Sequence, residues 1–160
     1  MRRSIVGLVV LTFVLLTLPA PKPVLANTEE DAGAPERPHR IEVFLGGTQA
    51  EESLDLAVGL SYEYRLSRLF GLGAFLEYAK KEHDAWIFAA PVYFHPYKGF
   101  RFLLAPGAER ETGKNRFLFR AGVAYEIEIR RWSIAPEFNV DLPDGGPTAL
   151  VFGASFGYAF

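Results

Sequence analysis

The feature that most constrains this chain is an alternation of large apolar residues with small or polar ones, which recurs from residue 41 to residue 160. In the stretch 117–129 every second position holds Phe, Phe, Ala, Val, Tyr, Ile or Ile, and the positions between them hold Leu, Arg, Gly, Ala, Glu and Glu. A period of two places successive side chains on opposite faces of a β-strand. The pattern therefore predicts strands whose two faces meet different surroundings.

Eight segments carry this alternation, and their phase is clear in four of them. The predicted strands are 41–48, 54–64, 69–79, 85–94, 100–107, 117–129, 132–141 and 149–160. Both faces carry apolar groups in 41–48, 69–79, 85–94 and 100–107, so the phase is open there. The predicted turns are 49–53, 65–68, 80–84, 95–99, 108–115, 130–131 and 142–147. Such short connections make consecutive strands antiparallel neighbours.

Prolines at three positions fall within the predicted strands. Pro91, Pro106 and Pro136 each remove a hydrogen-bond donor from the ladder. We expect them to mark bulges or strand ends, where a missing donor costs least.

The residues that alternate with the large apolar ones indicate which face of each strand lies outside. Its members are small: Ala57, Gly59, Ser61, Gly71, Gly73, Gly122, Ala124, Ser133, Ala135, Gly153, Ser155, Gly157 and Ala159. Such residues suit the interior of an eight-stranded barrel, which is just wide enough to be filled by side chains. The large apolar residues are too many for that interior, and they suit a lipid-facing band with aromatic groups near the strand ends. These aromatic groups are Tyr62, Tyr64, Tyr78, Tyr125, Trp132, Tyr158 and Phe160.

A strand architecture that spans a bilayer must close on itself, because hydrocarbon leaves no partner for an unpaired backbone group. The sequence therefore predicts an all-β fold over residues 41–160. Its form is a closed up-and-down antiparallel eight-stranded transmembrane β-barrel.

The first 40 residues are predicted to lie outside this barrel. Residues 1–26 combine Arg2 and Arg3 with an apolar run from 5 to 18 and a small-residue cleavage site ending at Ala26, as a secretory signal peptide does. The apolar run is short of the roughly 20 residues that a spanning helix needs. Residues 27–40 are too charged and proline-rich to bury a core, which predicts a disordered periplasmic leader.

The net charge restricts which partners are expected, and the cysteine content restricts how the fold can be stabilised. The formal net charge is −2 and becomes more negative once the cations of the signal peptide are removed, so nucleic acid is not an expected partner. The chain has no cysteine although it is predicted to be exported, so its stability must come from packing and pairing alone.

The chain resembles the small eight-stranded outer-membrane barrels of Gram-negative bacteria, such as those of the OmpA transmembrane-domain, OmpX and OmpW families. The resemblance covers the signal peptide, the strand pattern of 41–160 and the C-terminal residues Tyr158 and Phe160, with Ser155 where a glycine is common. It implies that Tyr158 and Phe160 form a recognition signal for the barrel-assembly machinery. It also implies a cell outer-membrane location, lipid as a partner, periplasmic chaperones during biogenesis and a monomeric barrel.

Charged residues recur on or near the predicted inward phase. They are Glu63, Glu77, Arg101, Arg120, Glu126, Glu128, Glu137 and Asp141. One interpretation is a network of paired charges that plugs the lumen, because an unpaired buried charge is very costly. The other is a polar pathway for small ions or solutes. Eight strands leave little free bore, which favours the plug.

No residue pattern predicts catalysis, a cofactor or a metal. Glu126 and Glu128 share one strand face without implying acid and base roles. The histidines His39, His83 and His95 are placed in the leader and in turns, without the spacing of metal ligands. Some small outer-membrane barrels are lipid-modifying enzymes, and their deacylases resemble a His-x-Ser arrangement. This chain has His95-Pro96-Tyr97 instead.

An even number of strands places both termini on the periplasmic side in this class. The turns on that side then carry Arg65, Arg68, Lys98, Arg130 and Arg131 without an acid. A contact of this basic edge with lipid phosphate is a hypothesis. The four loops on the other side are too short for a large adhesin.

The sequence thus predicts a non-enzymatic outer-membrane barrel with a structural or interaction role in the cell envelope. Three alternatives stay open. They are a narrow porin-like channel, a lipid-modifying enzyme, and a soluble ligand-binding barrel of the lipocalin kind. The small inward phase argues against the last of these, and the missing nucleophile against the second.

Overall fold

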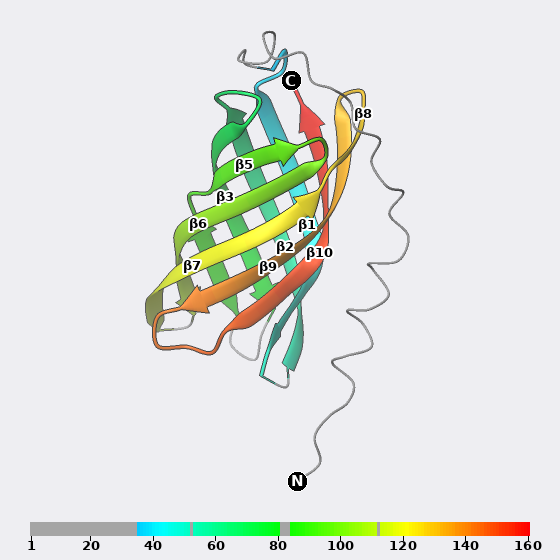
Figure 1. The fold of residues 1–160 in the computed structure, drawn as a ribbon. Helices are drawn as coiled ribbons and strands as arrows, with labels where there is room; N and C mark the ends of the chain where they lie inside the picture. Colours follow the sequence, from blue (N-terminus) through cyan, green and yellow to red (C-terminus); the bar gives the residue numbers. More distant parts are fainter. Residues whose placement is uncertain (1–34, 52, 81–83, 112) are drawn as a thin grey trace. The chain divides into compact units, whose positions relative to one another are not determined.

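A computed structural model describes residues 35–51, 53–80, 84–111 and 113–160, which form strands joined by short turns (Figure 1). The strands are β1 (His39–Ala50), β2 (Ser53–Arg65), β3 (Phe70–Lys80), β4 (Ala85–Ala89), β5 (Val92–Tyr97), β6 (Phe100–Glu111), β7 (Lys114–Tyr125), β8 (Ile127–Ile129), β9 (Trp132–Pro143) and β10 (Ala149–Ala159). The predicted signal peptide and the leader up to residue 34 lie outside the described residues. Within the described ranges, no helix is long and apolar enough to cross a membrane.

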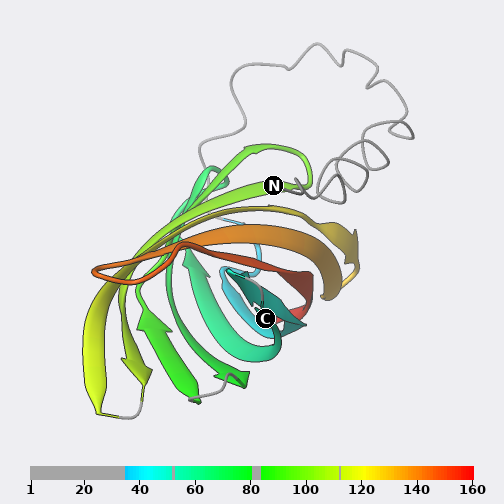
Figure 2. The same cartoon turned by 90° about the horizontal axis from the view of Figure 1, so that it is seen from below.

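The strands form one antiparallel sheet that closes on itself. All pairings are antiparallel, and the last strand, β10, pairs with both β9 and β1, so the sheet formed by the described strands has no open edge (Figure 2). β4 and β5 lie on one line, because both pair with β3 and β6 in a single register. β8 likewise continues β7 along β9. The ten segments therefore make eight strands around the barrel, which confirms the predicted fold class.

Of the three prolines expected at bulges or strand ends, Pro91 lies at such a break, whereas Pro106 and Pro136 lie inside β6 and β9, where the expectation was wrong. Pro91 stands in the gap between β4 and β5, and the amide of the preceding Ala90 donates to the carbonyl oxygen of Pro106 at 3.0 Å. Pro136 precedes Glu137, whose partner Ala124 is the last residue of β7 that pairs with β9 before the break. Since proline has no backbone donor, the ladder is interrupted there while the register on either side is kept.

The alternation in the sequence separates an exposed apolar face from a buried interior. Ile41, Val43 and Leu45 on β1 are 42%, 43% and 49% exposed, whereas Glu42 and Phe44 between them are 3% and 6% exposed. The same contrast follows β2, β6, β9 and β10. The large apolar residues therefore face away from the barrel axis, and charged, aromatic and small residues fill the inside.

Two glycines allow the barrel to close where β1 meets β10. Gly46 and Gly153 are opposite each other, and the ring of Phe44 lies over both. A Cβ on Gly46 would lie 2.4 Å from this ring, and one on Gly153 would lie 2.7 Å from it. The ring packs with Ala57 and Val151 in the buried core. Glycine at these two positions lets an aromatic side chain cover the seam from inside.

The boundaries of two predicted segments were wrong. Residues 108–115 were predicted as a loop, but β6 extends to Glu111 and β7 begins at Lys114, with Glu109 opposite Arg116. Residues 39 and 40 were assigned to the leader, but they begin β1, where Arg40 lies opposite Glu63. In both places charged side chains made a strand look like a solvated segment. Arg40 and Glu109 in these segments are buried inside the barrel, 4% and 3% exposed.

Candidate functional site

The barrel has two distinct ends. We call the end that holds His39, Phe160 and the turns 66–69, 98–99 and 130–131 the terminal end, which is uppermost in Figure 1. The other end, with the connections around residues 51, 84, 113 and 144–148, is the loop end. Among the described residues, most of the inward charges fall into three groups, ordered from the terminal end to the loop end.

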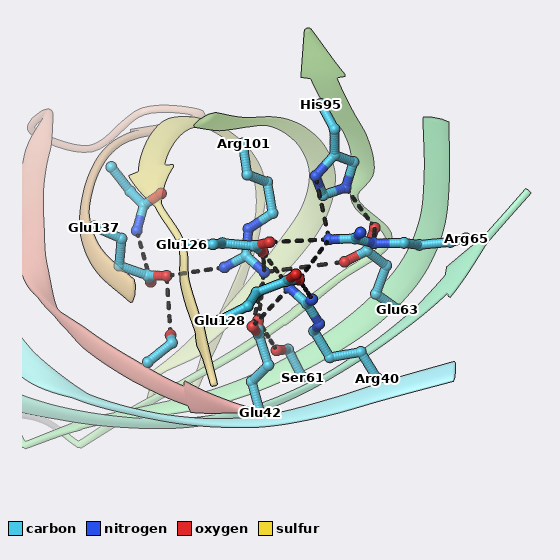
Figure 3. A network of polar contacts seen from close by, with 12 residues as sticks. Arg40, Glu42, Ser61, Glu63, Arg65, His95, Arg101, Glu126, Glu128 and Glu137 are labelled. Carbon is cyan, nitrogen blue, oxygen red and sulfur yellow. Dashed lines mark hydrogen bonds and ion pairs between the residues drawn. The ribbon is translucent and has the colours of Figure 1, made fainter. Parts of the chain in front are cut away.

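The largest group lies toward the terminal end, and we call it the Arg101 network (Figure 3). Its members are Arg40, Glu42, Glu63, Arg65, His95, Arg101, Glu126, Glu128 and Glu137. Five carboxylates thus meet three guanidinium groups and one imidazole. These residues come from β1, β2, β5, β6, β8, β9 and the residue between β7 and β8. The network therefore ties together nearly the whole circumference.

Arg101 stands at the centre of this network and is only 2% exposed. Its Nη1 donates to both carboxylate oxygens of Glu42, at 2.8 and 2.7 Å, and lies 2.8 Å from Oε1 of Glu126. Its Nη2 lies 3.4 Å from Glu137, and Glu63 is 4.0 Å from Nη1. A guanidinium group offers five donors in a fixed fork, which suits contact with several carboxylates at once.

Two further arginines close the network at the terminal end. Arg40 pairs with Glu126, and its Nη2 donates to Glu128 at 2.5 Å. Arg65 donates from Nη2 to Oε2 of Glu126 at 2.9 Å. Glu128 is the outermost member, because its side chain is 54% exposed while that of Glu126 is 4% exposed. Glu126 therefore receives all three guanidinium groups of the network.

His95 supplies the imidazole, and the prediction that it lies in a turn was wrong. It is on β5, beside a register shift between Phe94 and Tyr97. Its Nε2 is 2.7 Å from Oε1 of Glu63, and its Nδ1 is 3.4 Å from Nη2 of Arg65. Both ring nitrogens are thus engaged by network residues, which leaves neither to act as a base toward a hydroxyl nucleophile.

A second group, which we call the Arg120 triad, lies deeper in the barrel. Nη1 and Nη2 of Arg120 donate to the two oxygens of Glu77 at 2.7 and 2.8 Å. Nε and Nη2 donate to Asp141 at 2.5 and 2.7 Å. The guanidinium carbon is also 4.7 Å from the centre of the Phe75 ring. Four hydrogen bonds and one aromatic face enclose this buried cation.

The third group lies at the loop end. Arg116 pairs with Glu111, and its Nε is 3.6 Å from Glu109. These residues border a hollow of about 110 Å³ together with Leu118 and Ala149. Between the Arg101 network and the Arg120 triad the remaining space is only about 30 Å³. A water molecule needs about 10–15 Å³ of such space, so the middle of the barrel has room for about two or three waters.

The structure places the residues named from the sequence in two groups. Glu63, Arg101, Glu126, Glu128 and Glu137 meet in the Arg101 network, and Glu77, Arg120 and Asp141 form the separate triad. Among the described residues, no group of three or more His, Asp or Glu side chains has a geometry that could hold a metal ion.

Sequence reasoning missed four members of the network: Arg40, Glu42, Arg65 and His95. Glu42 follows the period of two along β1, but the phase of that segment was open. Arg65 was expected at the basic periplasmic edge, whereas its side chain turns inward to Glu126. Arg40 and His95 were missed because the prolines and charges near them are typical of loops and not of strands.

The C-terminal residues extend the barrel seam. Phe160 exchanges backbone hydrogen bonds with His39, at 2.9 and 3.2 Å, and its ring is stacked on the imidazole with centroids 5.5 Å apart. Tyr158 packs against Trp132, with ring centroids 4.9 Å apart. Both C-terminal aromatic residues therefore lie at the terminal end, on the outward face.

The fold is that of small outer-membrane barrels. The outer membrane protein Ail of Yersinia pestis in nanodiscs matches with a TM-score of 0.55 at 13% identity, over 78% of this chain and 100% of that one. The N-terminal β-barrel domain of Pseudomonas aeruginosa OprF matches with 0.50 at 13% identity, over 74% and 97%. A de novo designed transmembrane β-barrel matches with 0.54 at 12% identity, over 78% and 99%. No family model and no curated protein sequence matches this chain.

At these identities the likeness concerns the fold. It confirms the resemblance to small eight-stranded outer-membrane barrels that the sequence predicted.

Proposed function

We propose that this protein is a non-enzymatic integral outer-membrane barrel with a structural or interaction role in the cell envelope. The observation that carries this proposal is the apolar belt around a filled interior. Leu60 at the middle of β2 is 48% exposed and Phe156 on β10 is equally so, while the inward residues beside them are small or charged. A soluble protein of this size would not leave a continuous apolar belt in water.

Strand length supports a bilayer location. β1, β2, β3, β6, β7, β9 and β10 have 11 to 13 residues each. A tilted strand needs about 9–11 residues to cross the hydrocarbon core. The outward face therefore has the length for a membrane span and short polar ends beyond it.

The proposed partners follow from this location. Lipid of the outer membrane would surround the belt, and the chain would act as a monomer. During biogenesis the predicted signal peptide of residues 1–26 would direct export. Periplasmic chaperones and the barrel-assembly machinery would then receive the chain, with Tyr158 and Phe160 as the recognition signal.

We further propose that the lumen is closed by its paired charges. The support is the density of contacts in the Arg101 network and the roughly 30 Å³ of space that separates it from the Arg120 triad. An ion would have to displace a guanidinium group that several carboxylates hold. The polar groups of the interior thus serve to fill and brace the barrel.

A pair of matched substitutions tests the membrane location. Leu60→Arg puts a cation at the middle of the outward face, and Leu54→Arg puts one near the loop end of the same strand. For the refolded protein in lipid vesicles, we expect the first to lower the free energy of unfolding by about 2–4 kcal/mol and the second by at most about 1 kcal/mol. Equal small effects, together with folding in buffer without detergent, would favour a soluble barrel.

Recordings in planar bilayers test the closed lumen. We expect no steady unitary conductance from the wild-type protein, and measurable conductance once Arg101→Ala and Arg120→Ala are combined. Steady wild-type conductance would instead support the narrow channel. It would be cation-selective, since carboxylates outnumber guanidinium groups in the network. An altered mass of lipid A in cells that express the protein would support the alternative of a lipid-modifying enzyme.

A further inference from the structure

The terminal end carries a basic and aromatic groove on the outside of the barrel. A hollow of about 590 Å³ is lined by Arg37, Arg130, Arg131, Trp132 and Tyr158, and no acidic residue lines it. It lies beside a second hollow of about 270 Å³, whose lining includes Arg40 and Arg65 of the Arg101 network. We call the five residues of the larger hollow the rim groove.

The cations of the rim groove differ from the other arginines at this end. Arg40 and Arg65 turn inward and are paired with carboxylates. Within the described part of the chain, Arg37 and Arg130 have no carboxylate partner, and Arg131 donates only to the hydroxyl of Tyr158, at 3.2 Å. Most guanidinium donors of the groove are therefore free to bind an external anion.

The acids nearest to the groove do not neutralise it. Glu36 and Glu128 line the neighbouring hollow but not the groove itself. Glu128 is already bound to Arg40 at 2.5 Å and lies 4.0 Å from Arg65. The positive charge of the three arginines in the groove is therefore not compensated by these acids.

The backbone of Arg130 adds an independent observation. Its φ is +63°, in the left-handed region that glycine adopts most readily. The turns at residues 99, 113 and 145 use glycine at positive φ, with values of 86°, 79° and 70°. Glycine would meet the needs of the turn with less strain, so the turn itself does not account for an arginine at this position, which points to a role for its side chain.

We propose that the rim groove binds the phosphate of an anionic phospholipid in the leaflet at the terminal end of the barrel. Arginine forks match the geometry of phosphate oxygens. Trp132 and Tyr158 are of the residue types that lie at the headgroup level of a bilayer. Their rings are in contact at a tilt of 58° and lie next to the cations. This inference rests on the proposed membrane location of the barrel.

The two tryptophans of the chain allow a direct test, because they lie at opposite ends. Trp86→Phe leaves Trp132 in the groove as the reporter, and Trp132→Phe leaves Trp86. Each protein is refolded in phosphatidylcholine vesicles, and its fluorescence is quenched by brominated phosphatidylglycerol or brominated phosphatidylcholine. We expect Trp132 to prefer phosphatidylglycerol by roughly three- to tenfold, and the preference to fall in high salt.

Substitutions in the groove should remove this preference without unfolding the barrel. With Trp132 as reporter, Arg37→Gln, Arg130→Gly and Arg131→Gln together should bring the ratio to about one. Arg130→Gly relaxes the turn, so the free energy of unfolding should stay the same or rise. Two controls lie at the loop end: Arg110→Gln removes a cation, and Glu51→Gly relaxes the other turn with a non-glycine at positive φ, 52°. Neither should change the ratio at Trp132.

The outcomes separate the site from the location of the barrel. If the preference at Trp132 survives the triple substitution, or if Arg110→Gln lowers it as much, the groove is not a phosphate site. If neither brominated lipid quenches either tryptophan, the barrel is not in the bilayer. Both proposals then fail.

Discussion

The Arg120 triad and the Arg101 network compensate buried charge in different ways. In the triad one guanidinium group holds two carboxylates through four hydrogen bonds, and Arg120 and Asp141 are direct partners in the register of β7 and β9. In the network, charges come from strands on all sides of the barrel, and Glu126 alone is shared by three arginines.

Both groups pair charges across the lumen, since Arg120 on β7 meets Glu77 on β3 and Arg101 on β6 meets Glu42 on β1, but they differ in how widely each charge is shared. The triad is self-contained, so its three members form a unit that could be replaced together. The network has no such unit, because each carboxylate contacts cations that also hold other carboxylates. We therefore expect closure of the barrel to depend on the charges of the network. The triad should stabilise only the strands that it joins.

The largest effect should come from removal of Arg101. Arg101→Ala leaves several buried carboxylates without their central cation, and we expect the free energy of unfolding in vesicles to fall by about 4–5 kcal/mol. Urea titration followed by tryptophan fluorescence would measure it. Lys98→Ala in the exposed turn is the control. A loss below about 1 kcal/mol would show that the network does not stabilise the barrel.

Removal of Arg120 should lower the free energy of unfolding somewhat less, and two further substitutions should restore most of the loss. Arg120→Met alone leaves Glu77 and Asp141 without their cation, and we expect the free energy of unfolding to fall by about 3 kcal/mol. Adding Glu77→Gln and Asp141→Asn should restore most of it, because no buried charge then lacks a partner. If the triple variant is as unstable as the single one, the triad is not self-contained and the contrast with the network disappears.

A smaller effect is expected at the edge of the network. His95→Phe keeps the ring volume and removes the 2.7 Å contact with Glu63. The loss should be about 2 kcal/mol, because the acceptor is a carboxylate. His95→Gln, which keeps a side-chain donor, should lose about half as much. Equal losses from both variants would mean that packing of the ring, and not its hydrogen bond, is what matters at this position.

The smallest effect is expected at Glu128. Its side chain is 54% exposed, so its pairing with Arg40 is screened by water. Glu128→Gln should change the free energy of unfolding by at most about 0.5–1 kcal/mol. The matched buried variant is Glu126→Gln, which should be several times more costly because Glu126 serves three arginines. A reversed order would contradict the arrangement of the network.

The fold could be predicted because its signal is local. Strand β2 shows the alternation from Leu54 to Tyr64 directly, and its structure follows that phase. A strand's period of two is set by backbone geometry, whatever its neighbours are. The size of the inward residues then indicated a narrow closed barrel, and the pairing of β10 with β1 bears that out.

Much of the interior could not be predicted, because it depends on which residues meet across the lumen. Glu63, Glu126 and Arg101 could be named as inward charges, but Arg40 and His95 could not, since prolines and charges around them resemble those of a loop. Their strand positions are clear only when β1 closes against β10 and β5 lies between β3 and β6.

The sequence alone determined the alternating faces, the short connections and hence a closed barrel with an apolar exterior. Tertiary structure alone decided that Arg101 would join Glu42, 59 residues away, and that Arg40 would reach Glu128, 88 residues away. The reason is that alternation is a property of each strand, whereas contacts across the lumen depend on the tilt and stagger accumulated over all eight strands.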